Sequence, residues 1–254
     1  MMTPTNTPDG LRALDVVRAF GGTVALRGVS VEVRRGEVLG LIGPNGSGKT
    51  TLLNVLSGVL RSDSGTVHLG SRDISSWPSH RRARAGIART FQNLRLFTQL
   101  TVRENVEAAL ASSPPSWRRN GATADGLLEI TGVAAFADRT AGSLPYAHQR
   151  RLELARALGV GPAFLLLDEP SAGMGEAETA SLADTVRMVV SRFGCGVVCV
   201  DHDMQLIARV SDRLSVLQQG SLIASGAPSD VRTDPTVIEA YLGAAWTDVE
   251  EERS

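Results

Sequence analysis

The spacing of apolar and polar residues predicts strands near both ends of the chain and helices between them. Val29, Val31 and Val33 alternate with polar residues, which is the two-residue period of a strand with one buried face. The run VLGLI at 38–42 has no alternation, as expected of a central strand covered on both sides. The other expected strands lie at 11–17, 65–70, 164–168, 196–201 and 214–220.

Helical periodicity replaces these strand patterns between about Gln92 and Gly161. Thr101 and Glu104 have the spacing of a capping box, so a helix is expected to start there. The residues expected to share its buried face are Val102, Val106, Ala109 and Leu110. A further helix is expected within 143–158, with Leu152, Ala155 and Leu158 on its inner face. The chain is thus predicted to be an α/β protein with a helical insert at about 93–160.

Composition limits the class of protein. The chain has 254 residues, of which 43% are hydrophobic and 21% charged, with a formal net charge of −1. This balance is that of a globular protein and carries no basic excess that would indicate nucleic acid as a partner. Cys195 and Cys199 lie on one apolar run, where we expect both to be buried and reduced.

The ends of the chain are expected to lie outside the folded domain. Residues 1–10 are polar and punctuated by proline, which predicts a disordered tail without the features of a signal peptide. Residues 244–254 predict an acidic tail. No run reaches the roughly 20 apolar residues of a membrane span, so any work at a membrane would need another chain.

A phosphate-binding loop follows the central strand. GPNGSGKT at 43–50 matches G-x-x-x-x-G-K-[ST] between a strand and a helix, which is the context that this motif needs. Glycines let backbone N–H groups surround phosphate oxygens, and the helix N-terminus adds positive potential. Lys49 can reach the β- and γ-phosphates, and the Thr50 hydroxyl can ligate Mg²⁺. The expected nucleotide-binding residues here are Gly43, Pro44, Asn45, Gly46, Ser47, Gly48, Lys49, Thr50 and Thr51.

Two further strands end in polar groups. FLLLDE delivers Asp168 and Glu169 to the edge where the loop lies, so Asp168 is expected to hold Mg²⁺ and Glu169 to polarise the attacking water. VVCVDHDM delivers His202 to the same edge, where an imidazole can bond a γ-phosphate oxygen. We favour this over a purely structural histidine.

Three other features have a functional and a plain interpretation. Gln92 in TFQN can ligate Mg²⁺ or hold water, or it can be an exposed loop residue. Phe20 can stack on adenine or belong to the core. The basic cluster SHRRARAG at 79–86 is expected to be a solvated face, with contact to a membrane surface or an acidic partner as the alternative.

Together these motifs resemble the ATPases of ATP-binding cassette (ABC) transporters. GPNGSGKTTLL, FQN, LPYAHQRR, LLLDEP and VDHDM occur in that family's order and approximate spacing over about 11–243. The resemblance implies one ABC ATPase domain at 11–243, with a P-loop NTPase core built on a RecA-like mixed sheet with flanking helices, an antiparallel β part and the helical insert. It also implies ATP and Mg²⁺ as cofactors. The implied roles are general base for Glu169, switch histidine for His202, loop glutamine for Gln92, magnesium ligands for Thr50, Gln92 and Asp168, adenine stacking for Phe20 and dimer contact for 171–174.

The resemblance also identifies an altered motif. The family's Leu-Ser-Gly-Gly-Gln corresponds to the segment Leu144, Pro145, Tyr146, Ala147 and His148, called the signature segment below. Such ATPases form head-to-tail dimers in which this segment closes over the partner's ATP. Pro145 has neither a hydroxyl nor an N–H to offer, and losing one charge-assisted hydrogen bond costs about 1.5–3 kcal/mol. The site that uses this segment is therefore expected to be the weaker one. The resemblance also implies a partner ATPase of different sequence, and hence two unequal ATP sites.

The stretches GIARTFQNLRLFTQLTVRENV and LIASGAPSDVRTDPTVIEAYLG are similar to the branch that imports branched-chain and other hydrophobic amino acids. This implies an ATPase at the cytoplasmic face of the membrane. The implied partners are two membrane-embedded permease subunits, a second ATPase and an extracytoplasmic solute-binding protein, with no nucleic acid. Importers of urea and exporters of lipid remain alternatives. A soluble ABC protein without a transporter and a P-loop kinase or GTPase fit less well.

Overall fold

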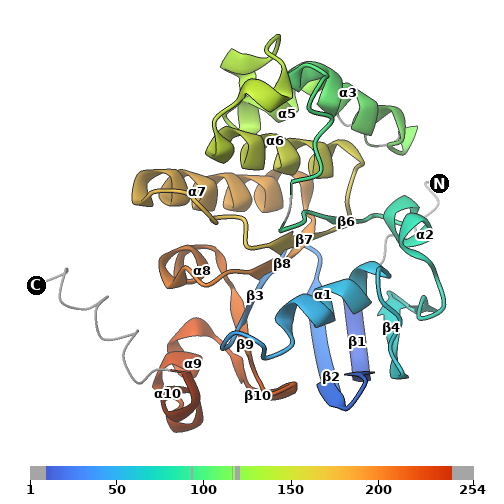
Figure 1. Cartoon of the computed structure of the whole chain (residues 1–254), viewed down its shortest axis with the longest axis vertical. Helices are drawn as coiled ribbons and strands as arrows, with labels where there is room; N and C mark the ends of the chain where they lie inside the picture. Colours follow the sequence, from blue (N-terminus) through green and yellow to red (C-terminus); the bar gives the residue numbers. More distant parts are fainter. Residues whose placement is uncertain (1–9, 93, 116, 118–120, 242–254) are drawn as a thin grey trace, which may run out of the picture.

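The computed structural model describes residues 10–92, 94–115, 117 and 121–241, and these form two sheets flanked by helices (Figure 1). The tails expected at 1–9 and 244–254 lie outside this part of the chain. The prediction that Gly10 belongs to the N-terminal tail is wrong, because this residue is buried and begins β1. The strands are β1 Gly10–Phe20, β2 Thr23–Arg34, β3 Val38–Ile42, β4 Ser64–Leu69, β5 Arg72–Asp73, β6 Ile87–Arg89, β7 Phe164–Asp168, β8 Gly196–Val200, β9 Arg213–Gln218 and β10 Ser221–Gly226. The expected strands are all present, and β5, β6 and β10 are additions.

The larger sheet is mixed and has the order β10-β9-β3-β8-β7-β6. Its inner strands pair in parallel, and only β10 runs antiparallel to its neighbour. Every residue of β3, β7 and β8 is buried, which agrees with their uninterrupted apolar runs. Asp168 and Leu41 both pair with Val200, so these three strands end together at one edge of the sheet.

The smaller sheet is antiparallel, with the order β2-β1-β4-β5. Its long hairpin β1–β2 has register shifts at three places, where bulges or irregularities interrupt the pairing. A core cluster fills the space between the two sheets around α1, with Leu11, Leu39, Leu52 and Phe164 each at most 1% exposed. The α/β class predicted from the spacing of apolar residues is confirmed.

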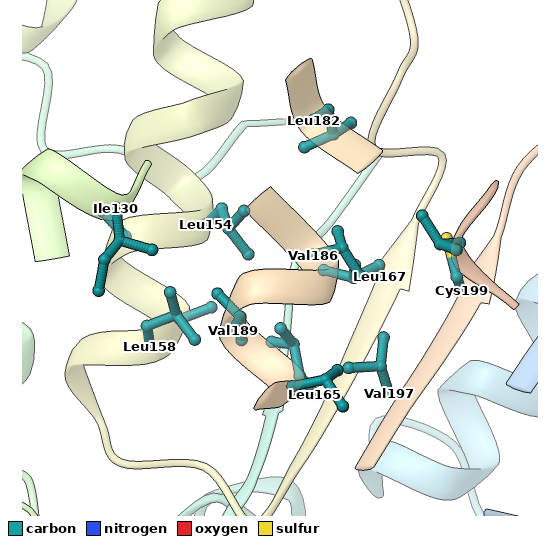
Figure 2. Packing of buried hydrophobic residues seen from close by; sticks show 14 of the residues in the cluster. Ile130, Leu154, Leu158, Leu165, Leu167, Leu182, Val186, Val189, Val197 and Cys199 are labelled. Atoms are coloured by element: carbon teal, nitrogen blue, oxygen red, sulfur yellow. The ribbon is translucent and has the colours of Figure 1, made fainter. Parts of the chain in front are cut away.

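Helices pack against both faces of the larger sheet and form a separate group at one end (Figure 1). They are α1 Lys49–Ser57, α2 Ser79–Arg84, α3 Val102–Ala111, α5 Ala124–Ile130, α6 Tyr146–Gly159, α7 Glu176–Phe193, α8 Met204–Val210, α9 Pro228–Thr233 and α10 Pro235–Tyr241, with 3₁₀ turns at Ala134–Phe136 and Ala141–Ser143. Helices α3, α5 and α6 gather beyond α7 at the top of the figure. In Figure 2, Leu154 and Leu158 of α6 face Val186 and Val189 of α7, which in turn cover β7.

Several local predictions can be compared directly with this structure. The Thr101–Glu104 capping box is confirmed, because each side chain bonds the other residue's backbone N–H. Both cysteines are buried, as expected. Helix α6 buries Leu152, Ala155 and Leu158 but also Arg150, Arg151 and Glu153, so it is enclosed on more than one side.

The basic cluster at 79–86 is not wholly solvated, and that prediction is wrong for one residue. Arg82 is 1% exposed and donates to the carbonyls of Val55 and Leu56 at the C-terminus of α1. It also donates to the carbonyls of Ser75 and Trp77. Burial lowers the pKa of Arg82 to about 10. A cation here interacts favourably with the carbonyl groups at the C-terminus of a helix.

Candidate functional site: a phosphate loop and carboxylates at the sheet edge

The loop between β3 and α1 has the backbone shape that its glycines predict. Gly43, Gly46 and Gly48 have φ of 146°, 79° and 107°, which a residue with a side chain adopts only under strain. A Cβ at Gly43 would lie 2.0 Å from the carbonyl oxygen of Leu217, and one at Gly48 would lie 2.6 Å from that of Ala25. The loop is therefore held tightly between β9 and β2, and glycine is required for its conformation.

Lys49 begins α1 and folds back over this loop. Its Nζ donates to the carbonyl oxygens of Gly43 at 2.6 Å and Pro44 at 2.9 Å. Burial lowers the pKa of Lys49, and the negative charges of Glu169 and Asp168 oppose that shift. The hydroxyl-bearing residue that follows, Thr50, is exposed. A cation, an exposed hydroxyl and a helix N-terminus therefore face the same region, as phosphate binding requires.

Asp168 ends β7 and is 2% exposed. Its Oδ2 accepts from Arg89 Nη2 at 2.8 Å, and the two side chains are 3% and 5% exposed. The expected Mg²⁺ ligands, Thr50, Gln92 and Asp168, offer only oxygen atoms, which Mg²⁺ prefers. Within the described ranges, no three His, Cys, Asp or Glu side chains gather as a metal site. The oxygen donors of Thr50, Gln92 and Asp168 fit Mg²⁺ in their chemistry.

Glu169 follows in a left-handed conformation, with φ of 47°. For a residue with a side chain this costs about 1–3 kcal/mol, and such strain persists only where the surroundings impose it. Here the Glu169 N–H donates to Val200 O at 2.8 Å. Gln92 Nε2 donates to Glu169 Oε2 at 3.2 Å, so the glutamine and the carboxylate meet across the site.

His202 follows β8, and its side chain is 69% exposed. Its Nδ1 lies 3.6 Å from Oδ1 of Asp201, which is itself 1% exposed. Asp201 accepts from the Ser171 hydroxyl at 2.8 Å and from the Ser171 N–H at 3.0 Å. This buried carboxylate therefore joins the histidine to the beginning of the 171–174 loop, a link that the sequence analysis did not predict.

Phe20 ends β1 with its side chain exposed, so the alternative that it belongs to the core is wrong. The Arg18 guanidinium lies 4.8 Å from the ring centroid, and Arg18 also pairs with Asp63. One face of the ring is thus held by a cation, which leaves the ring able to stack on a base with its other face.

The signature segment precedes and opens α6. Pro145 is the N-cap, one position before the first helical turn, and the Gln149 N–H donates to its carbonyl. Tyr146 is 45% exposed, and its ring packs against Gly173 in the 171–174 loop. Leu144 and Ala147 are buried, and the His148 ring packs edge-on against Phe136 at 4.6 Å. The histidine ring is therefore directed into the helical group.

Comparison with known proteins decides the family. The family model for "ABC transporter" matches residues 26–172. This chain belongs to the ABC transporter ATPases. A second family model, described as "Branched-chain amino acid ATP-binding cassette transporter", matches residues 221–247 of this ABC ATPase.

Its curated relatives include two amino-acid transport proteins. BraF of Pseudomonas aeruginosa, a "high-affinity branched-chain amino acid transport ATP-binding protein", is 40% identical over 89% of this chain and 94% of its own length. LivG of Escherichia coli K12, with the same description, is 38% identical over the same shares. The lipopolysaccharide export protein LptB of Acidithiobacillus ferridurans is 36% identical over 92% of this chain and 96% of its own.

Solved structures agree. The ADP conformation of MJ1267, an ATP-binding cassette of an ABC transporter, superimposes with a TM-score of 0.80 at 32% identity, covering 92% of this chain and 98% of that one. As an ABC ATPase the chain binds nucleotide, and its ATPase activity is coupled to transport. Such subunits work beside permease subunits and are peripheral to the membrane. None of the helices in the described part of this chain has the length and apolar character needed to cross a bilayer.

A buried arginine ties the segment that carries Gln92 to α6 in this ABC ATPase. Arg150 donates to the carbonyl oxygens of Phe91 at 2.7 Å and Gln92 at 2.5 Å. It also pairs with Glu153 at 3.3 Å, and Glu153 accepts from the Phe91 N–H. Burial raises the pKa of Glu153, while the Phe91 N–H and the Arg150 charge oppose the shift. The guanidinium lies 5.2 Å from the Tyr146 ring.

A groove of about 380 Å³ lies beside this segment. Phe91 and Phe97 line it, together with residues of α2, α3 and α6. Phe97 is 51% exposed, and the Arg156 guanidinium lies 4.6 Å from its ring centroid. Phe91 and Gln92 are adjacent in the sequence of this ABC ATPase. Phe91 lines the groove, and the Gln92 side chain bonds Glu169.

Sequence reasoning missed Arg89, Arg150 and Asp201. A signal was present for Arg89, because a charged residue closes the short apolar stretch GIA in a sequence that leads directly to Gln92. Arg150 lies among alternating apolar and charged residues, and nothing in the sequence around it predicts that it is buried.

Proposed function

We propose that this chain is the ATP-hydrolysing subunit of an importer for branched-chain or other hydrophobic amino acids, at the cytoplasmic face of the membrane. The match of residues 221–247 to the branched-chain amino acid family model carries the assignment of cargo. The names of BraF and LivG support it. The chemistry rests on the phosphate loop, Asp168 and Glu169 at one edge of the sheet.

In the proposed mechanism, backbone N–H groups of 43–50 and Lys49 bind the phosphates of ATP, and Phe20 stacks on adenine. Thr50, Asp168 and Gln92 would hold Mg²⁺, which neutralises phosphate charge during transfer. Glu169 accepts a proton from the attacking water, and Gln92, 3.2 Å from Glu169, orients that water. His202 donates to a γ-phosphate oxygen. Water displaces ADP from the γ-phosphorus, which yields ADP and phosphate.

The transporter would contain a second ATPase of different sequence, two permease subunits and an extracytoplasmic solute-binding protein. The N–H groups of Tyr146, Ala147 and His148 precede the first hydrogen bond within α6 and can face the partner's ATP. Pro145 offers no donor, so this half-site is the weaker one. The groove lined by Phe91 and Phe97 suits a permease segment, because it adjoins the loop segment that carries Gln92.

The test is uptake by cells in which Glu169→Gln replaces the wild-type chain. Labelled leucine and labelled urea are offered separately, and Glu176→Gln, an exposed carboxylate at the start of α7, is the matched control. We expect Glu169→Gln to abolish most leucine uptake and Glu176→Gln to retain it. Loss of urea uptake alone would reassign the cargo. Normal uptake of both, with the variant present at normal levels, would refute the proposal.

A further inference from the structure

Arg89 is a buried arginine beside the nucleotide site for which the proposed mechanism has no role. It ends β6, and its side chain is only 5% exposed. A buried guanidinium is expensive to desolvate unless its N–H groups find acceptors. The acceptors that Arg89 bonds therefore indicate which parts of the fold it holds together.

The acceptors of Arg89 come from two different elements. Nη2 donates to Asp168 Oδ2 on β7 at 2.8 Å. Nη1 donates to Asn54 Oδ1 at 2.6 Å and to Ser57 Oγ at 3.0 Å, both on α1. One planar group thus spans the end of β7 and the last turns of α1.

These two elements carry the groups that must meet around one ion. Thr50 lies in the first turn of α1, one turn before Asn54, and Asp168 is the last residue of β7. Mg²⁺ demands near-ideal octahedral geometry, so small errors in the separation of its ligands weaken its binding. A guanidinium that bonds both elements restricts that separation, and its pairing uses only one of the two carboxylate oxygens of Asp168.

We propose that Arg89 is a positioning residue that holds the Asp168 carboxylate and helix α1 in register for binding Mg²⁺ with ATP. This deepens the proposed function and rests on its assignment of Thr50 and Asp168 to the ion. Arg89 itself touches neither phosphate nor metal in this role. Its contribution is to the part of ATP affinity that depends on Mg²⁺.

The experiment measures the dissociation constant of ATP for the full-length chain by calorimetry, in Mg²⁺ and in EDTA. The dissociation constant in EDTA divided by the dissociation constant in Mg²⁺ is called the magnesium gain. Glutamine at position 89 is neutral and too short to span both elements, so we expect Arg89→Gln to reduce the gain at least tenfold. Affinity in EDTA should stay within twofold of the wild type, because Arg89 bonds none of the loop residues.

Three further variants separate positioning from general support of the fold. Arg151→Gln also removes a buried arginine, one that bonds the carbonyls of Thr131 and Glu178, and should retain the gain. Arg89→Lys keeps the charge and should restore part of the gain. Asn54→Ala removes one α1 partner while leaving the Asp168 pair, so it should cause a smaller loss and remains informative if Arg89→Gln does not fold.

A double-mutant cycle completes the test. In an Asn54→Ala background, Arg89→Gln should lower the gain by a smaller factor than it does alone, because part of the effect of Arg89 passes through its bond to Asn54. An unchanged or increased gain in Arg89→Gln would overturn the inference. Absence of any gain in the wild-type chain would instead overturn the proposed magnesium site, so the two failures are distinguishable.

Discussion

Replacing Arg150 with methionine should destabilise the fold by an amount that depends on pH. The side chains of Arg150 and Glu153 are 3% and 7% exposed, and the pair is 3.3 Å apart. Methionine preserves much of the length of arginine but leaves Glu153 buried without its counter-charge and removes the donors to Phe91 and Gln92. Breaking a buried pair in this way costs about 3–5 kcal/mol.

The pH dependence follows from Glu153. Burial already raises its pKa, and removing the opposing charge of Arg150 raises it further. A folded state with the higher pKa binds more protons than the unfolded state. The variant therefore loses stability as pH rises from the ordinary glutamate range through the raised pKa, by up to about 1.4 kcal/mol per pH unit. The destabilisation should be larger at pH 8 than at pH 5.

Urea unfolding of wild type and variant at both pH values, followed by circular dichroism, measures this difference. The double variant Arg150→Met/Glu153→Gln is the control, because glutamine can still accept from the Phe91 N–H but carries no charge to bury. We expect it to recover much of the stability lost at pH 8 and to lose the pH dependence. Equal destabilisation at both pH values, or a double variant no more stable than the single one, would refute the reasoning.

Two other predictions concern titratable groups. Burial lowers the pKa of Lys49 from 10.5, and bound phosphates should raise it again. ATP affinity should therefore fall as pH rises through that lowered pKa. Calorimetry between pH 7 and 10 measures this pH dependence of the affinity, and the variant Lys49→Met should lack it. Burial raises the pKa of Cys195 to about 11 and that of Cys199 well above its usual range. Iodoacetamide at pH 8 should therefore modify neither thiol in the folded chain and both in urea, and mass spectrometry showing alkylation of the folded chain would contradict this.

The strands of the core could be predicted because each carries its own pattern. The run at β3 is apolar at all five positions, and the structure buries all five. The three-residue strand β6 has no such pattern and exists because it pairs in parallel with β7, 77 residues further along the chain. Arg82 shows the same limit: a cluster of charges favours solvent, and only the position of the α1 carbonyls explains why one arginine is buried.

The candidate site divides in the same way. Gly43–Thr50, Asp168, Glu169 and His202 could be predicted because their chemistry is local: a loop or strand end delivers each group to the sheet edge. The residues that hold these groups could not, since the partners of Arg89 and Arg150 lie 32–79 and 3–59 residues away in sequence. A buried arginine is stable only where several distant acceptors converge, so its burial records tertiary geometry that no short motif contains. Variants of these arginines therefore test how the site is held together, whereas variants of the motif residues test only its chemistry.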